Sequence, residues 1–171
     1  MQRLSWKEYF MYIAIMASLR SNCKKRKVGC IIVKDNRVLS TGMNGTPTGF
    51  VNCLDGGCDR CNDNTIQSGE KLDQCICIHA EDNALLEVER YKIFDSSIYC
   101  TSFPCLSCTK KILQCKIKNI YYLQTYNDDI IVNDLISKNN IYTEQINLDL
   151  SYNILQDYVV KHDHSTQKST L

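Results

Sequence analysis

The residues with the clearest chemistry in this chain are one histidine, one glutamate and two cysteines. His79 and Glu81 form an H-x-E motif, and Cys105 and Cys108 follow in a P-C-x-x-C motif. One imidazole and two thiolates supply three zinc ligands and leave the fourth position of a tetrahedral ion open, as in catalytic zinc sites. Zinc lowers the pKa of a bound water from about 15.7 to about 7. Glu81, just beyond the histidine, is placed to carry protons instead of binding the metal.

A structural zinc site is the alternative interpretation of the same residues. A C-x-x-C pair with one histidine often forms a zinc knuckle, and a histidine that opens a helix is often only a cap. A structural site needs a fourth protein ligand, however, and gives Glu81 no role. The combined pattern therefore favours catalysis, and it matches the known signature of zinc-dependent nucleobase deaminases.

At 171 residues the chain is expected to form one domain with a substantial core. We expect that domain over residues 1–161, with a cysteine-rich insertion at about 50–77 and a polar, flexible tail over 162–171. The net charge of +1 argues against a nucleic-acid partner, because such proteins usually carry a strong basic excess. No apolar run approaches the ~20 residues that cross a bilayer. The N-terminus also lacks a signal peptide, so we expect no membrane partner and a cytoplasmic location.

The hydrophobic pattern alternates between helices and strands. Ser5 and Glu8 form a capping box before a helix that starts at Trp6. Further helices are expected over 80–90, 105–115, 128–138 and 152–160, and strands over 28–33, 38–39, 98–100, 120–123 and 141–146. This alternation predicts an α/β/α sandwich in which His79 and Cys105 begin two helices. Residues 41–77 lack periodicity, which indicates a functional segment or one held by something other than a hydrophobic core.

From about Trp6 to Asp129 the chain resembles the deoxycytidylate (dCMP) deaminases of the cytidine deaminase superfamily. Beyond the zinc motif, the resemblance is carried by R-S-N-C at 20–23, V-G-C at 28–30, T-G-M-N-G-T-P at 41–47 and T-S-F-P-C at 101–105. The segments G-G-C-D-R-C at 56–61 and C-I-C at 75–77 are most similar to the fungal members. The resemblance implies a three-layer α/β/α sandwich with a five-stranded mixed sheet. It also implies deamination of dCMP to dUMP and ammonia, which feeds thymidylate synthesis, by a hexamer activated by dCTP with Mg²⁺ and inhibited by dTTP.

The resemblance also implies roles for residues outside the zinc motif. Asn44 matches an asparagine that contacts the sugar and base region, and Arg26, with Lys24 beside it, matches the basic segment near the nucleotide phosphate. Tyr126 matches a tyrosine that closes the substrate pocket. The loop linked to effector binding corresponds to residues 42–49, and includes Gly42, Asn44, Gly45 and Gly49. Met43 stands where the loop usually has a tyrosine, which indicates weaker or different effector control.

Each of these assignments has a simpler alternative. The basic run at 24–27 is also typical of a solvated turn. Asn44, between Met43 and Gly45, is also typical of a turn. Tyr126 is one of ten tyrosines and is equally compatible with a place in the core or on the surface.

The remaining cysteines suggest a second metal site. Without export, the 11 cysteines are expected to be metal ligands and buried thiols, not disulfides. By resemblance to members with a structural zinc, the expected ligands are Cys23, Cys53 and Cys77, with a fourth from Cys58, Cys61 or Cys75. These six cysteines could instead bind two zinc ions that share thiolates, or be buried free thiols. Free thiols are the expectation for Cys30, Cys100 and Cys115.

Two other functions compete with dCMP deamination. The first is a deaminase that acts on another substrate. The near-neutral charge argues against tRNA, and the basic segment argues against a free base or nucleoside, but neither separates dCMP from dCTP. The second is a non-catalytic zinc module that binds nucleic acid or protein. Glu81 and the absence of a basic excess argue against that module.

Overall fold

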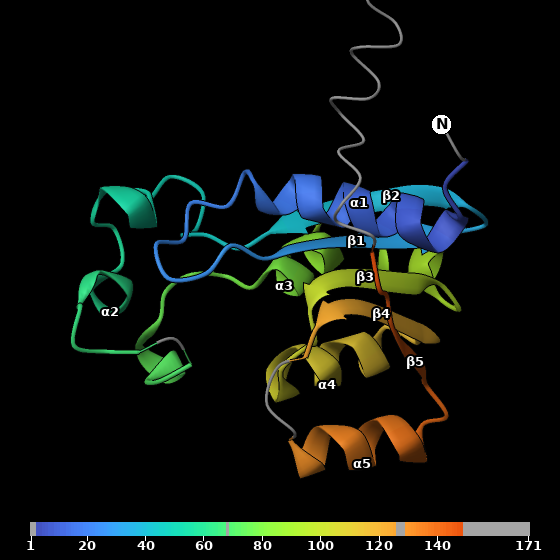
Figure 1. Ribbon diagram of the computed structural model, residues 1–171. Helices are drawn as coiled ribbons and strands as arrows, with labels where there is room; N and C mark the ends of the chain where they lie inside the picture. Colours follow the sequence, from blue (N-terminus) through green and yellow to red (C-terminus); the bar gives the residue numbers. More distant parts are fainter. Residues whose placement is uncertain (1–2, 68, 126–128, 149–171) are drawn as a thin grey trace, which may run out of the picture.

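One mixed β-sheet of five strands organises the computed structural model, which describes residues 3–67, 69–125 and 129–148 (Figure 1). Its strands lie in the order β2-β1-β3-β4-β5. They span β1 (Gly29–Lys34), β2 (Arg37–Met43), β3 (Ser97–Ser102), β4 (Asn119–Gln124) and β5 (Tyr142–Gln145). β1 is antiparallel to β2 and β3, and β3, β4 and β5 are parallel. The five-stranded mixed sheet expected from the sequence is confirmed.

Helices cover both faces of the sheet and complete the three layers (Figure 1). α1 (Trp6–Ser18) begins with the predicted capping box, since Ser5 and Glu8 each bond the other's backbone N–H. It packs against Ile31 and Val33 of β1. α3 (Ala80–Leu86), α4 (Leu106–Gln114) and α5 (Ile130–Lys138) pack on the other face. Alternate residues of β1 therefore enter two separate cores, as the pleat of a strand requires.

The helix that begins after His79 packs against the backbone of β2. A Cβ on Gly42 would lie only 2.1 Å from the carbonyl oxygen of Ala80 and 2.5 Å from the nitrogen of Ala84. Only glycine allows this approach at position 42. The close contact sets the depth of α3 in the fold, and so the position of the site at its N-terminus.

The helix predicted over residues 80–90 is shorter in the structure. α3 ends at Leu86, and a short 3₁₀ helix, η3 (Arg90–Ile93), follows. Ile93 is fully buried in the core beneath the sheet, so tertiary packing overrides the helical pattern of the sequence. The helix expected over 152–160 and the tail at 162–171 lie outside the described residues.

The segment between β2 and α3 extends from one side of the sheet, on the left of Figure 1. It contains the 3₁₀ helices η1 (Cys53–Asp55) and η2 (Leu72–Gln74) and the short helix α2 (Asp59–Asn62). Four of its cysteines form a buried cluster with Cys23, and Cys75 packs against that cluster. The local core of this part of the chain therefore consists of buried cysteine side chains.

Among the described residues, no helix has the length and apolar character needed to cross a membrane.

Candidate metal and substrate site

His79, Cys105 and Cys108 come together at the N-termini of two helices. His79 is the N-cap of α3, Cys105 is the N-cap of α4, and Cys108 lies in the first turn of α4. The Nδ1 of His79 is 3.3 Å from the Sγ of Cys108 and 3.5 Å from that of Cys105. Both cysteines lie where the positive end of the α4 dipole favours the thiolate.

The protonation of these three groups fits a metal site. A hydrogen bond from the Cys108 thiol, with help from His79, lowers the pKa of Cys105 to about 3. The bond to Cys105 raises the pKa of His79 to about 9. The pKa of Cys108 is raised by its bond to Cys105 and by burial. His79 and Cys108 would therefore each have to release a proton in order to bind a cation.

The donor set of this site suits zinc with an open coordination position. The three ligand atoms lie within 4.8 Å of one another, and no fourth His, Cys, Asp or Glu of the described chain joins them. One nitrogen and two sulfur ligands are typical of zinc, and three protein ligands are typical of catalytic zinc. The residues present therefore fit this metal.

Glu81 lies beside the three ligands without belonging to their set. It stands in the first turn of α3, is 4% exposed and lines the same pocket as His79 and Cys105. Burial raises the pKa of its carboxyl group to about 7, although the charge of His79 opposes that shift. A carboxyl group with a pKa near neutrality can both accept and donate a proton.

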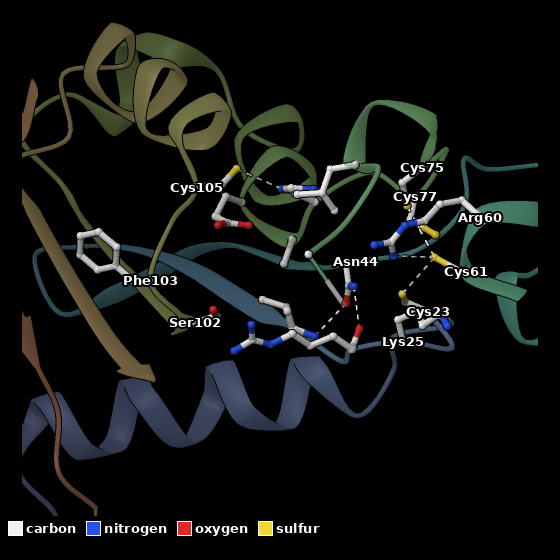
Figure 2. Close-up of a pocket in the computed structure, with 17 residues that line it drawn as sticks. Cys23, Lys25, Asn44, Arg60, Cys61, Cys75, Cys77, Ser102, Phe103 and Cys105 are labelled. Carbon is white, nitrogen blue, oxygen red and sulfur yellow. Dashed lines mark hydrogen bonds between the residues drawn. The ribbon is translucent and has the colours of Figure 1, made fainter. Parts of the chain in front are cut away.

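A pocket connects these residues with the cysteine-rich segment (Figure 2). Ser102, Phe103 and Cys105 lie on one side of it, and Cys61, Cys75 and Cys77 lie on the other. Asn44 lies between the two groups in the view of Figure 2. The pocket thus has one wall that includes the candidate ligand Cys105 and an opposite wall that is rich in cysteine.

Asn44 is a buried hydrogen-bonding centre in this pocket. Its Oδ1 accepts from the backbone N–H of Val28 at 2.8 Å and from the hydroxyl of Ser21 at 2.7 Å. Its Nδ2 donates to the carbonyl oxygen of Arg26 at 2.8 Å. The side chain thereby ties the basic segment to the end of β2, which is more than a simple turn former does.

The residues predicted to contact the phosphate lie in different places. Arg26 lines the pocket, and its guanidinium donates to the Oε1 of Gln124 at 3.2 Å. The ammonium of Lys24 instead donates to the Oδ1 of Asn62 at 3.0 Å, in α2. Tyr126 lies outside the described residues.

The predicted effector loop is divided between a strand and a turn. Gly42 belongs to β2, Gly45 pairs with Ile78, and Gly49 has a φ of 87° in a turn. A cavity of about 570 Å³ borders this loop and is lined by Asn22, Gly42, Asn44, Gly45 and Asn83, among others.

Sequence reasoning missed some of the residues that line this pocket. Ser102 and Phe103 precede the candidate ligand Cys105 in the T-S-F-P-C segment, so their position along the chain was a usable signal. Arg60, which is 5% exposed, also lines the pocket and donates to the carbonyl oxygens of Gln67 and Glu70. A buried arginine has no comparable signal in the sequence.

The six remaining cysteines predicted as ligands come together in two sets. One set is Cys23, Cys53, Cys61 and Cys77, and the other is Cys58, Cys61, Cys75 and Cys77. Within each set all sulfur atoms lie within 4.8 Å of one another. Cys30 and Cys100 instead contact each other at 3.4 Å in the hydrophobic core, where free thiols were expected.

Comparison with protein families finds one that covers most of the chain. Residues 4–124 match the model of the cytidine and deoxycytidylate deaminase zinc-binding region. Deoxycytidylate deaminase of Schizosaccharomyces pombe is 52% identical over 128 residues, which cover 74% of this chain and 39% of that protein. The Saccharomyces cerevisiae deoxycytidylate deaminase is 48% identical over 130 residues, or 75% of this chain and 41% of that protein. The chain therefore spans about two fifths of the length of these two relatives.

A solved structure is similar over a larger share of its own length. The dCMP deaminase of cyanophage S-TIM5, determined in complex with dCMP and dUMP, superimposes with a TM-score of 0.65. It is 33% identical, and the alignment covers 85% of this chain and all of the phage protein.

Proposed function

Because the chain belongs to the cytidine and deoxycytidylate deaminase family, we propose that it catalyses the zinc-dependent hydrolytic deamination of dCMP to dUMP and ammonia. The observation that carries this proposal is the convergence of His79, Cys105 and Cys108 with Glu81 buried beside them in one pocket. The phage relative with dCMP and dUMP bound supports the choice of substrate. A non-catalytic zinc module would leave the buried carboxyl group of Glu81 without a role.

The roles of the catalytic residues follow from their chemistry. His79, Cys105 and Cys108 would hold zinc, which when bound supplies the Lewis acidity that makes water nucleophilic at neutral pH. Glu81 accepts the proton of the attacking water and delivers it to the ring nitrogen of the pyrimidine. It then accepts the second proton of the former water, which is now a hydroxyl on the pyrimidine carbon, and donates it to the exocyclic nitrogen, so that the C–N bond breaks, a C=O bond forms and ammonia leaves. A carboxyl group with a pKa of about 7 can perform both transfers.

We assign substrate orientation to other residues that line the same pocket as Glu81. We assign the phosphate contact to Arg26, because this residue lines the pocket, whereas Lys24 does not line it and its ammonium bonds to Asn62. Asn44 has one amide hydrogen beyond the bond to Arg26, and we assign that donor to the sugar and base region. The assignment of Tyr126 to pocket closure rests on resemblance alone.

We also propose that nucleotide effectors control the enzyme. We assign the binding of dCTP with Mg²⁺, and of dTTP in its place, to the cavity that borders Gly42 and Gly45. Met43 in this loop reduces stacking on the effector base if a tyrosine normally provides it. We propose a homo-oligomer, with a hexamer favoured by family resemblance.

A deaminase that uses dCTP is the second candidate, because the basic segment does not distinguish one phosphate from three. The test is an ammonia-release assay with dCMP, dCTP, deoxycytidine and CMP, each with and without dCTP or dTTP as effector. The proposal expects the highest kcat/KM with dCMP and little turnover of deoxycytidine. Preferred turnover of dCTP would replace the proposed substrate, and no ammonia from any of the four would end the deaminase proposal.

A further inference from the structure

We propose that six of the seven cysteines between α1 and α3, all except Cys30, form a binuclear zinc cluster in which Cys61 and Cys77 each bind both ions. The starting observation is the overlap of the two ligand sets. Cys23 and Cys53 complete a group of four with Cys61 and Cys77, and Cys58 and Cys75 complete a second group with the same pair. Six sulfur atoms thus provide two four-ligand sites. This inference is independent of the proposed deaminase activity, because it concerns other residues and its readout is metal content.

The sulfur separations match tetrahedral coordination in both sets. A Zn–S bond of about 2.3 Å places two sulfurs of a tetrahedron about 3.8 Å apart. The Sγ of Cys23 lies 4.0 Å from that of Cys61 in the first set. In the second set the Sγ of Cys75 lies 3.6 Å from that of Cys61 and 4.0 Å from that of Cys58. These three separations suit a tetrathiolate zinc site, the other sulfur pairs of each set lie within 4.8 Å, and all six cysteines are free of disulfide bonds.

Backbone N–H groups donate hydrogen bonds to a cysteine sulfur in each of the two sets. The N–H of Lys24 donates to the Sγ of Cys53 at 3.4 Å, in the first set. In the second set, backbone hydrogen bonds from Cys61 and Ile76 reach the sulfur of Cys58. Such bonds are stronger when the acceptor is a thiolate. Cys53 and Cys58 each belong to only one set, and each accepts a backbone hydrogen bond at its sulfur. A single zinc ion would therefore leave one of these hydrogen-bonded sulfurs without a metal.

A buried arginine offsets part of the negative charge of the shared cysteines. Arg60 is almost fully buried, and its Nη1 lies 3.8 Å from the Sγ of Cys61 (Figure 2). Its other donors are held by the carbonyl oxygens of Gln67 and Glu70. Six thiolates and two Zn²⁺ ions leave two negative charges in the cluster, and the guanidinium offsets one of them. A buried cation beside a shared sulfur is therefore favourable.

The chain path brings the ligands of both sets together by a tight turn. Gly56 has a φ of 95°, and a Cβ on Gly57 would lie only 1.8 Å from the carbonyl oxygen of Val51. These two glycines let the chain reverse between Cys53, which belongs to the first set, and Cys58, which belongs to the second. This turn therefore allows Cys53 and Cys58, which are close in the sequence, to belong to different metal sites.

The test is a zinc count on the purified full chain by inductively coupled plasma mass spectrometry. We expect three zinc ions per chain, of which one belongs to the His79 set and two to the six cysteines. Cys23→Ser should lose one ion because the second set stays complete, and Cys58→Ser should lose one because the first set stays complete. Cys115→Ser is the matched control, since Cys115 belongs to neither set, and it should keep all three.

The outcomes separate the cluster from a mononuclear site. Two ions per wild-type chain, with either Cys23→Ser or Cys58→Ser retaining both, would overturn the proposal. If either variant fails to fold, cadmium-113 NMR of the metal-exchanged wild-type chain decides instead. Two thiolate-bound resonances with a scalar coupling through shared sulfur would support the cluster, and one resonance, or two without coupling, would overturn it.

Discussion

Cys77 and His79 are separated by one residue, yet their side chains belong to different ligand sets. Cys77 is shared by the two cysteine sets, and His79 belongs to the candidate catalytic set. Ile78, between them, exchanges two backbone hydrogen bonds with Gly45, at 2.8 and 3.2 Å. The backbone just before His79 is therefore anchored by the bridge between Ile78 and Gly45 and by Cys77 in the sulfur cluster. The cysteine-rich segment thus supports the geometry of the site as well as its own fold.

This relationship predicts that a substitution of Cys77 lowers kcat by displacing His79. Cys77→Ser should lower kcat by roughly 10-fold to 10²-fold, because a small displacement of a catalytic group is costly. Cys58→Ser is the matched comparison, since it removes an unshared ligand far along the chain from His79, and its kcat should stay close to that of the wild type. Steady-state ammonia release by both variants measures the difference. Equal kcat values would show that the cluster does not position the imidazole.

The two basic residues predicted to bind phosphate should differ in importance. Arg26→Gln should lower kcat/KM for dCMP about 10-fold, which corresponds to ~1.4 kcal/mol of transition-state binding. The same change should leave the low turnover of deoxycytidine unaltered, because that substrate has no phosphate. Lys24→Gln is the control of equal charge, and it should have a smaller effect because its ammonium bonds to Asn62. Equal losses for both substrates in Arg26→Gln would contradict the assignment.

Local signals in the sequence predicted the parts of the molecule that depend on neighbouring residues. The capping box at Ser5 was predicted because its two partners lie three positions apart, and the strand pattern was predicted because alternation is local. The burial of Ile93, which accompanies the early end of α3, depends on packing with distant elements.

The same limit applies to the candidate site. The spacing of His79 and Cys105 with their motif neighbours identified residues that do lie together. The hydrogen bonds of Asn44 and the burial of Arg60 depend on partners far along the chain or on the folded path of a loop, and residue type alone does not reveal them. The sharing of Cys61 and Cys77 likewise needs coordinates, because composition leaves both one-metal and two-metal arrangements open.

Gly42 offers a test of how closely the catalytic helix must approach the sheet. Gly42→Ala places a methyl group 2.1 Å from the carbonyl oxygen of Ala80, so α3 must move. We expect a loss of about 1–3 kcal/mol in the free energy of unfolding, and a lower kcat. Gly49→Asn is the control, because open space surrounds Gly49 and asparagine tolerates its positive φ. Urea denaturation measures both variants, and an unchanged midpoint for Gly42→Ala would contradict the close approach.

Glu81 should be essential for turnover without being a metal ligand. Glu81→Gln keeps the size of the side chain but removes its capacity to accept a proton, so kcat should fall by about 10²-fold to 10⁴-fold. Zinc content should stay at the wild-type value because the three-ligand set is intact. Ammonia release and metal analysis of the same preparation test both statements. A loss of zinc together with activity would instead make Glu81 a ligand or a support of one.

The buried carboxyl group also predicts a specific dependence of stability on pH. Burial raises the pKa of Glu81 to about 7 in the folded chain, above its ordinary value of 4.5. Between these values the folded state binds a proton that the unfolded state has released, so this group stabilises the fold below its unfolded pKa. That contribution is lost as pH rises through about 7. The contribution of this group to the free energy of unfolding is at most about 3 kcal/mol.

Urea denaturation from pH 4 to pH 8, with the three-ligand site freed of metal by a chelator, should show the wild type losing stability relative to Glu81→Gln as pH rises. Parallel curves for the two proteins would mean that the carboxyl group is already ionised in the folded state at low pH.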